Sequence, residues 1–208
     1  MKITQFTGGP CETNCYLVAL PEGNLLIDAT EGVADYFKKT KIDMLFLTHA
    51  HFDHVMDAAK IVREHGCSAV MHEITEELIA DTGLLRRYGL DIEIEPLKAT
   101  QHLIEGVGLM LLGKKFDLYE VPGHCPGSIC LHDAENGILY GGDVLFAGGV
   151  GRWDLPGGDR DLLLSGIRNK LLPLPPATRV LSGHGPETTI GVEKETNPYI
   201  SCFAAGDV

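Results

Sequence analysis

The chain has 208 residues and a formal net charge of −12, from 17 Lys and Arg against 29 Asp and Glu. Its 44% apolar and 22% charged residues are typical of a globular protein, which excludes disorder for the chain as a whole. The acidic balance argues against nucleic acid or an anionic membrane as a partner, because binding a polyanion needs a basic face and basic residues here never cluster beyond pairs such as Lys38-Lys39.

The N-terminus and the cysteines bear on localisation. Residues 1–7 are too polar for a secretory leader, and no apolar run approaches the roughly 18 residues that span a bilayer. The cysteines form no Cys-x-x-Cys pair, which excludes a zinc ribbon or a thioredoxin motif. They are Cys11, Cys15, Cys67, Cys125, Cys130 and Cys202. We therefore expect a cytoplasmic protein with thiol cysteines, a monomer or small homo-oligomer that acts on a small molecule.

The first half of the chain predicts three strands, a helix, a fourth strand and a second helix. The strands are expected at residues 2–6, 15–19, 24–27 and 44–47. A short helix is expected at residues 33–39. A second helix follows the fourth strand, with apolar residues at positions i, i+3, i+4 and i+7: Val55, Ala58, Ala59 and Val62. A histidine-rich turn joins that strand to this helix.

The second half repeats this alternation. Strands are expected at residues 69–72, 109–112, 116–121, 128–132, 138–140 and 179–181, with helical segments through Arg87. Asp159 is the predicted N-cap of a helix that Pro173 ends, and Pro198 ends a terminal helix. No linker or repeat divides the sequence. We therefore predict a single domain over residues 1–208, of class α/β (α+β), with two mixed sheets each covered by helices on its outer side.

Three of the nine histidines lie in one short segment, Thr48-His49-Ala50-His51-Phe52-Asp53-His54. A His-x-His pair on an extended turn points both imidazoles to the same side, because side chains two apart in extended backbone share a face. Asp53 and His54 enter the following helix and face a neighbouring point. One loop can therefore offer ligands to two adjacent cations, and imidazole with carboxylate suits Zn²⁺, Fe²⁺ or Mn²⁺.

Three further polar residues, His124, Asp143 and His184, follow predicted strands in turns marked by glycine or proline. Glycine lets the backbone approach a metal centre closely. Taken alone, each is an ordinary turn residue. Together with the histidine-rich loop, they indicate a metal centre.

The spacing of these residues resembles that of the metallo-β-lactamase-fold superfamily. His-x-His-x-Asp-His is followed by His after 70 residues, Asp after a further 19 and His after a further 41. The segments Gly-His-Cys-Pro-Gly-Ser at 123–128, Gly-Asp-Val-Leu-Phe at 142–146 and Gly-His-Gly-Pro-Glu-Thr-Thr-Ile-Gly at 183–191 resemble its glyoxalase II-like branch, the short hydroxyacylglutathione hydrolase-like proteins. The resemblance implies an αββα sandwich of two mixed β-sheets flanked by helices.

The resemblance also implies two divalent metal ions, with zinc expected and iron or manganese as alternatives. The implied ligands of the first ion are His49, His51 and His124. Those of the second ion are Asp53, His54 and His184, and Asp143 is the implied bridge.

A water shared by two such ions becomes a hydroxide nucleophile near neutral pH, and Asp53 is the candidate to orient it. The implied activity is hydrolysis of a thioester such as S-lactoylglutathione, because a thiolate leaving group needs little protonation. Two alternatives stay open: a mononuclear iron, persulfide dioxygenase-like oxidoreductase, and a lactone or lactam hydrolase on the same fold.

Other residues have a functional and a structural interpretation. Asp28 is expected beneath the histidine-rich loop, where it would fix the tautomer of a ligand, and Thr48 is expected to donate a hydrogen bond within that loop. Arg152 either binds a substrate carboxylate or pairs with Asp154. Trp153 is either an apolar wall of the substrate site or part of the core.

Two positions depart from the usual pattern of the family. Cys125 replaces the usual Thr, and packing as a small apolar residue is its expected role. Asp57 lies just after the metal-binding motif and is expected at the rim of the second ion.

Overall fold

The computed structural model describes residues 1–87 and 89–200, which divide into two compact units. Unit 1 comprises Met1–Leu103 and Met110–Lys114, and unit 2 comprises Ile104–Leu109 and the residues from Lys115 onward. The expectation of a single domain over residues 1–208 stays a prediction.

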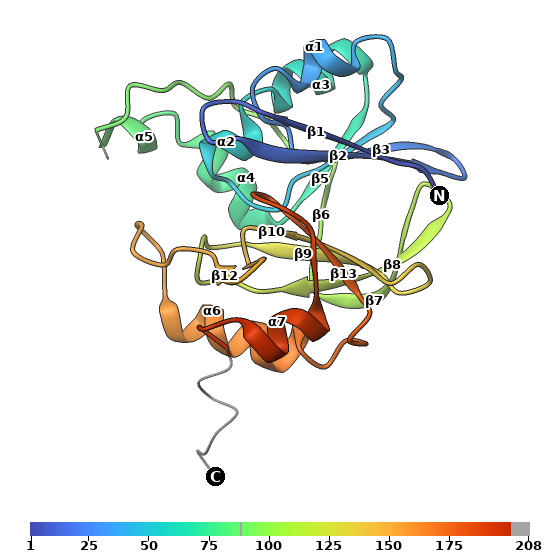
Figure 1. The fold of residues 1–208 in the computed structure, drawn as a ribbon. Coiled ribbons are helices and arrows are strands. Elements are labelled where there is room, and N and C mark those ends of the chain that lie inside the picture. The colour runs from blue at the N-terminus through green and yellow to red at the C-terminus, as the bar shows by residue number, and fades with distance from the viewer. Residues whose placement is uncertain (88, 201–208) are drawn as a thin grey trace. The chain divides into compact units, whose positions relative to one another are not determined.

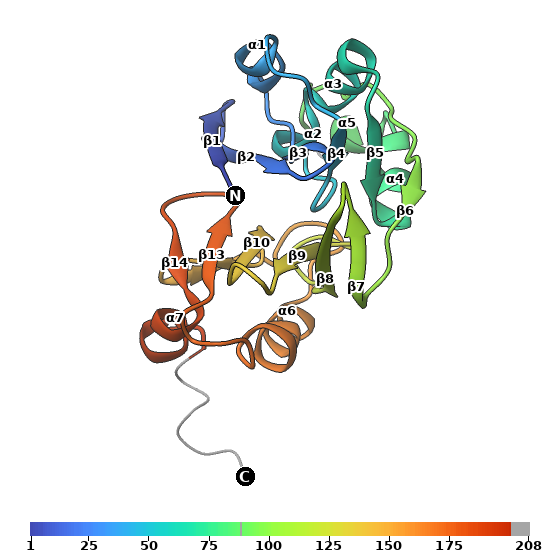
Figure 2. The ribbon, with the colours of Figure 1, turned by 90° about the vertical axis from the view of Figure 1, so that its right-hand side faces the viewer.

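Unit 1 is built on a six-stranded mixed sheet, whose strands lie side by side in chain order (Figure 2). The strands are β1 (Ile3–Gly8), β2 (Thr13–Leu20), β3 (Gly23–Ile27), β4 (Met44–Phe46), β5 (Ser68–Met71) and β6 (Gln101–His102). The first three pair antiparallel, and β3 to β6 run parallel. The carboxyl ends of β3 and β4 therefore meet at one edge of the sheet, where the residues that follow them become neighbours.

Five helices accompany this sheet: α1 (Val33–Phe37), α2 (Phe52–Val55), α3 (Ala58–His65), α4 (Glu73–Ala80) and α5 (Leu84–Arg87). Figure 1 shows α1 and α3 above the strands of unit 1. Leu26 and Leu45 of the sheet share a buried core with Val33 of α1 and Ile61 of α3. Burying such apolar side chains is the main stabilising contribution, at about 25 cal/mol per Å² removed from water.

The helix predicted after the histidine-rich turn is interrupted at Asp57. Its Oδ2 accepts hydrogen bonds from the backbone N–H groups of Gly32 (2.9 Å) and Ala34 (3.0 Å), and its own N–H donates to Ala29 O (2.9 Å). These bonds keep Asp57 out of the hydrogen-bonding pattern of an α-helix. Two short helices, α2 and α3, therefore stand in place of the single predicted helix. The carboxylate of Asp57 thus caps the start of α1, and its expected place at the rim of the second ion stays a prediction.

Unit 2 carries a second six-stranded mixed sheet, in the order β14-β13-β10-β9-β8-β7. Its strands are β7 (Gly106–Leu111), β8 (Lys114–Glu120), β9 (Ile129–Asp133), β10 (Ile138–Gly142), β13 (Arg179–Ser182) and β14 (Thr188–Thr189). β10 and β13 run parallel, so their carboxyl ends lie together. A separate two-stranded hairpin follows β10 and consists of β11 (Leu145–Phe146) and β12 (Gly149–Val150).

Helices α6 (Arg160–Gly166) and α7 (Ile190–Thr196) lie below this second sheet in Figure 1. Asp159 caps α6 as predicted, accepting a hydrogen bond from Leu162 N–H (2.9 Å). The predicted continuation of this helix toward Pro173 is a wider π-helical turn, η1 (Ile167–Leu171). Leu163 and Ile167 share a buried core with the sheet.

The predicted strands are confirmed, with ends displaced by a few residues, and so are the predicted helices apart from the interruption at Asp57. In the described part of the chain, no helix is long and apolar enough to cross a bilayer. The five cysteines within that part form no disulfide with one another. Cys202 lies outside the described residues.

Candidate metal centre

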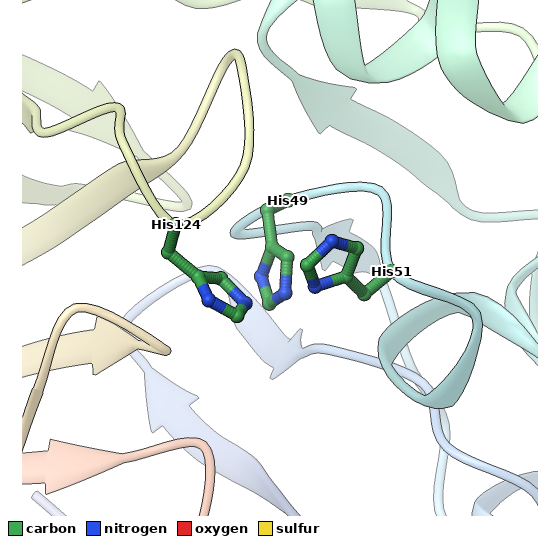
Figure 3. A group of neighbouring side chains, drawn as sticks. All are labelled: His49, His51 and His124. Atoms are coloured by element: carbon green, nitrogen blue, oxygen red, sulfur yellow. The ribbon is translucent and has the colours of Figure 1, made fainter. Parts of the chain in front are cut away.

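The loop after β4 brings three imidazoles of unit 1 together. The ring centroid of His49 lies 4.8 Å from that of His51 and 4.2 Å from that of His54. Figure 3 shows His49 and His51 side by side on this loop, and labels His124 on the turn after β8 of unit 2. The loop is extended up to His51, which precedes α2, so imidazoles from the turn and from the helix converge.

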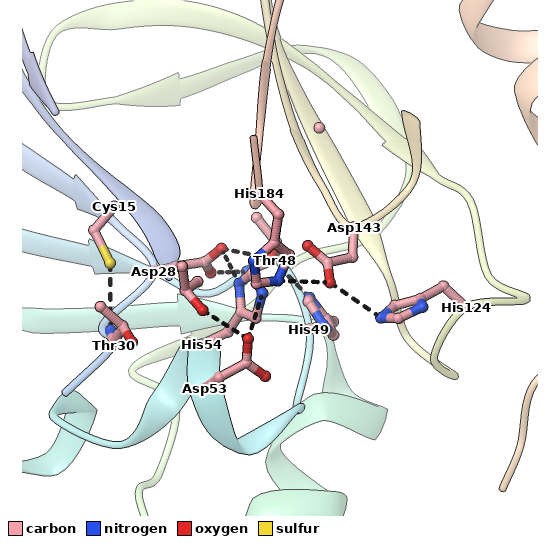
Figure 4. Close-up of polar contacts among 12 residues, drawn as sticks. Cys15, Asp28, Thr30, Thr48, His49, Asp53, His54, His124, Asp143 and His184 are labelled. Carbon is pink, nitrogen blue, oxygen red and sulfur yellow. Dashed lines mark hydrogen bonds and ion pairs between the residues drawn. The ribbon is translucent and has the colours of Figure 1, made fainter. Parts of the chain in front are cut away.

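Asp28, directly after β3, lies beneath this loop and is 2% exposed (Figure 4). Its Oδ1 accepts from Thr48 N–H (2.8 Å), and its Oδ2 accepts from the Thr48 hydroxyl (2.8 Å) and from His54 Nδ1 (2.7 Å). The parallel pairing of β3 and β4 places the two strand ends next to each other, which explains these contacts. Asp28 has a φ of 59°, a left-handed conformation that Asp tolerates better than most residues.

This network assigns the tautomers of two histidines. His54 Nδ1 faces a carboxylate and therefore carries a proton. The Thr48 hydroxyl donates to Asp28, so its oxygen accepts from His49 Nδ1, 2.9 Å away. Both rings consequently present the lone pair of Nε2, as metal-binding histidines do when the other nitrogen is hydrogen-bonded.

Thr13, on β2, holds the carboxylate of Asp53. The fully buried Thr13 hydroxyl donates to Asp53 Oδ2 at 2.7 Å, and the same oxygen lies 3.5 Å from His54 Nε2. The two partners are 40 residues apart, and no local sequence pattern connects them. Thr13 is therefore a residue of the candidate site that the sequence analysis missed.

In unit 2, His124, Asp143 and His184 follow β8, β10 and β13 and lie close together (Figure 4). Asp143 Oδ2 lies 3.2 Å from His184 Nε2 and 3.5 Å from His124 Nε2. Gly183 N–H donates to Gly142 O (2.8 Å), which joins the ends of the parallel strands β10 and β13. His124 Nδ1 donates to the backbone carbonyl of Arg152 (2.8 Å), so its Nε2 also carries the lone pair.

The donor chemistry within each unit fits a divalent cation. Two ligand atoms that each lie about 2.1 Å from a tetrahedral ion are about 3.4 Å apart. Asp53 and His54 are separated by 3.5 Å, as are Asp143 and His124. In both pairs a carboxylate oxygen faces the imidazole Nε2, so an ion between these two atoms would have both as ligands.

Arg152 forms a two-point ion pair with Asp154, with Nε 2.8 Å and Nη2 2.7 Å from the carboxylate oxygens. Both side chains are exposed, and the guanidinium lowers the pKa of Asp154 to about 2. Trp153 is half-buried against the core of unit 2, with Arg160 over its ring at 5.7 Å and Tyr199 edge-on at 6.0 Å. The pairing predicted for Arg152 is therefore present. Its role in substrate binding, and that of Trp153, stay predictions.

Cys125, directly after His124, is 2% exposed. Its backbone carbonyl accepts from the Ser128 hydroxyl (2.8 Å), which closes the turn that carries His124. This burial is in keeping with the packing role expected for Cys125.

Comparisons with known proteins extend over almost the whole chain. The sequence profile of the metallo-beta-lactamase superfamily matches residues 8–184, a range that contains all seven predicted metal ligands. The hydroxyacylglutathione hydrolase GloC of Haemophilus influenzae is 34% identical, over 91% of this chain and 93% of its own length.

Two solved structures are similar in both sequence and fold. BLEG-1, a B3 metallo-beta-lactamase, superposes with a TM-score of 0.87 at 34% identity, covering 96% of this chain and 100% of its own. TTHA1623 in a di-iron-bound form superposes with a TM-score of 0.83 at 39% identity, covering 94% of this chain and 99% of its own.

Proposed function

Because the chain belongs to the metallo-beta-lactamase superfamily and has its fold, we propose that it is a dinuclear metallo-hydrolase that cleaves thioesters such as S-lactoylglutathione. The observation that carries this proposal is that hydrogen bonds within each unit hold three of the proposed histidine ligands in the tautomer that binds metal. In His49, His54 and His124, a hydrogen bond at Nδ1 leaves Nε2 available for a metal ion.

The proposed ligand set draws on both units. His49, His51 and His124 would hold one ion, Asp53, His54 and His184 would hold the other, and Asp143 would bridge them. Zinc is the proposed metal, and the di-iron form of TTHA1623 makes iron the first alternative. Family membership is the basis for combining ligands of unit 1 with ligands of unit 2 in this set.

Two divalent ions, when bound, would supply a hydroxide nucleophile at neutral pH and a Lewis acid for the carbonyl under attack. The chain's own residues fix the geometry of this chemistry. Asp28 and Thr48 hold His49 and His54 in the metal-binding tautomer. Thr13 holds the carboxylate of Asp53, which is the proposed group that orients the nucleophile.

The choice of a thioester rests on two arguments. Its thiolate leaving group departs at neutral pH without a general acid. In addition, a relative that is 34% identical, GloC, is named as a hydroxyacylglutathione hydrolase. BLEG-1, at the same identity, is named as a B3 metallo-beta-lactamase, so a lactam is the second candidate substrate.

Turnover of a small substrate panel by the metal-replete protein tests the proposal. The panel contains S-lactoylglutathione, a lactone, a β-lactam and glutathione persulfide. We expect the thioester to give the highest kcat/KM, and Asp143→Asn to abolish its cleavage. Asp161→Asn, at a carboxylate that is 93% exposed in the same unit, is the matched control and should act like wild type. Preferred cleavage of the β-lactam, or oxygen uptake with the persulfide, would contradict the thioesterase assignment.

A further inference from the structure

Glu193, on α7 of unit 2, is a buried carboxylate held by three hydrogen-bond donors. It is 1% exposed. Its Oε1 accepts from the Thr188 hydroxyl (2.5 Å), and its Oε2 accepts from Gly148 N–H (2.9 Å) and Asn197 Nδ2 (2.8 Å). Burying a polar group is costly unless hydrogen bonds satisfy it, and these three donors satisfy both oxygens of Glu193.

The partners of Glu193 hold the tip of the hairpin formed by β11 and β12. Gly148 is in the turn of this hairpin and donates its N–H to Glu193. The neighbouring Gly149 accepts at its carbonyl from Asn197 Nδ2 (2.9 Å), and Asn197 is itself fully buried. Glu193 of α7 and Asn197, the residue directly after α7, thus bind a donor and an acceptor of the hairpin backbone and fix the hairpin's position.

The same hairpin and the residues that follow it contact all three candidate ligands of unit 2. The ring of Phe146, on β11, lies edge-on to the ring of His184, with centroids 6.1 Å apart. Two residues after β12, the carbonyl of Arg152 accepts the hydrogen bond from His124 Nδ1.

Gly151, between β12 and Arg152, lies close to Asp143 and to His124. A Cβ atom at this position would lie 2.0 Å from the carbonyl oxygen of Asp143 and 2.9 Å from the Cβ of His124. Because the backbone passes this closely, a displacement of the hairpin moves the ligand residues as well.

We propose that Glu193 is a positioning residue for the metal centre: through Gly148, Gly149 and the hairpin, it fixes the hydrogen bond between Arg152 O and His124 Nδ1. This inference rests on the proposed function for its consequence in catalysis. The contact itself belongs to the metal-free protein.

Two substitutions at Glu193 have different expected effects. Glu193→Ala leaves Gly148 N–H, Asn197 Nδ2 and the Thr188 hydroxyl without their acceptor. Glu193→Gln can keep its carbonyl oxygen toward Gly148 and Asn197 and donate its amide to the Thr188 hydroxyl, which can accept. The glutamine variant should therefore rescue what the alanine variant loses.

Hydrogen exchange of the His124 ring, measured by ¹⁵N NMR on metal-free protein, tests the proposal. We expect Glu193→Ala to speed exchange of the His124 Nδ1 proton about tenfold or more, the scale of one lost hydrogen bond. Glu193→Gln should stay close to wild type. The exposed Glu195, on the same helix, supplies the matched control Glu195→Ala, which should change nothing. Amides of β9 and β10 should keep their exchange rates, whereas a purely stabilising role would speed them equally.

Zinc affinity by chelator competition gives a second readout, with an expected loss of about tenfold in Glu193→Ala. If that variant does not fold, Asn197→Ala removes only the bonds of the amide and is measured in the same way. A folded Glu193→Ala or Asn197→Ala with wild-type exchange at His124 and wild-type zinc affinity would overturn the proposal. Failure of the wild type to cleave thioesters would overturn the proposed function and leave the exchange result to decide on Glu193.

Discussion

Asp28 Oδ2 lies 2.7 Å from His54 Nδ1, and this contact sets the tautomer of His54. Through the Thr48 hydroxyl, the same carboxylate also sets the tautomer of His49. One buried side chain thus prepares two of the proposed ligands, although it would touch neither metal ion itself.

Asp28→Asn should weaken zinc binding by roughly ten- to hundredfold, as expected when a hydrogen-bond partner of a ligand is lost. An Asn amide turned toward His54 donates to Nδ1 and so moves the ring proton to Nε2, the metal-binding nitrogen. Asn also tolerates the left-handed φ of 59° at this position, so the backbone is spared. Chelator competition measures the affinity, and ¹⁵N NMR of the histidine rings measures the tautomer.

The control for Asp28 is Asp35→Asn, at a carboxylate that is 74% exposed in the same unit. It should bind zinc like wild type. Unchanged zinc affinity in a folded Asp28→Asn protein would show that the contact does not prepare the ligands.

Thr13→Val should lower the metal content of the second proposed site, because it removes the hydrogen bond that holds Asp53 Oδ2. A hydrogen bond to a charged group contributes about 1.5–3 kcal/mol, which corresponds to a roughly tenfold or larger loss of affinity. Thr13→Ser keeps the hydroxyl and should bind metal like wild type. Metal per chain at limiting zinc distinguishes the variants, and equal content in Thr13→Val and Thr13→Ser would disprove this role.

Arg152→Ala should raise KM for S-lactoylglutathione more than it lowers kcat, with a roughly tenfold or larger fall in kcat/KM. Contacts to a remote carboxylate are made similarly in the ground and transition states, which is why the loss falls on KM. Asp154→Asn separates the two interpretations of Arg152. If Arg152 binds substrate, this variant frees the guanidinium and KM does not rise. If the pair only shapes the loop, both variants raise KM equally.

The pH dependence of this pair follows from the lowered pKa of Asp154, about 2. A carboxyl whose pKa is depressed on folding contributes stability above its unfolded pKa, and loses it as pH falls toward the folded pKa. The Arg152–Asp154 pair therefore stays charged at any assay pH from about 5 to 9. The KM effect of Arg152→Ala should consequently be constant over this range.

His132, on β9, predicts a loss of stability in mild acid. Burial lowers its pKa, while Asp117 and Asp133 act in the opposite direction. The unfolded chain, with a histidine pKa of about 6.5, therefore binds more protons than the folded chain just below that pH, so the free energy of unfolding falls as pH falls. Denaturant titrations of chelator-treated protein between pH 8 and pH 5 measure this slope.

The variant His132→Leu should have a shallower slope below about pH 6.5 than wild type. Asp117→Asn removes a charge that favours the protonated ring and should give a steeper one. A His132→Leu protein with the wild-type slope would exclude His132 as the source.

The sequence contained enough information for the longer elements and for the family. Strands such as β2 and β9 carry a local apolar pattern, and the spacing from His49 to His184 identifies a family. The strands β6, β11, β12 and β14 have only two residues each, which is too short for a periodic apolar pattern to be recognised.

The contacts that hold the candidate ligands could not be predicted in the same way. Thr13 and Asp53 are 40 residues apart, and Gly148 and Glu193 are 45 apart. Neither pair leaves a periodic or local signal. The capping role of Asp57 was not predicted for a related reason, since its partners Gly32 and Ala34 lie at the start of a helix that precedes it in the chain.

The number of divalent ions per chain tests the dinuclear assignment most directly. Protein loaded with excess zinc, desalted and assayed for metal should hold about two ions per chain. His184→Ala should retain about one, and Asp143→Ala should lose metal from both sites, because only Asp143 is assigned to both. Thermal melts accompany these counts, since removing a ligand also lowers stability. A wild-type protein that holds only one ion under metal-replete conditions, and prefers iron, would contradict the account.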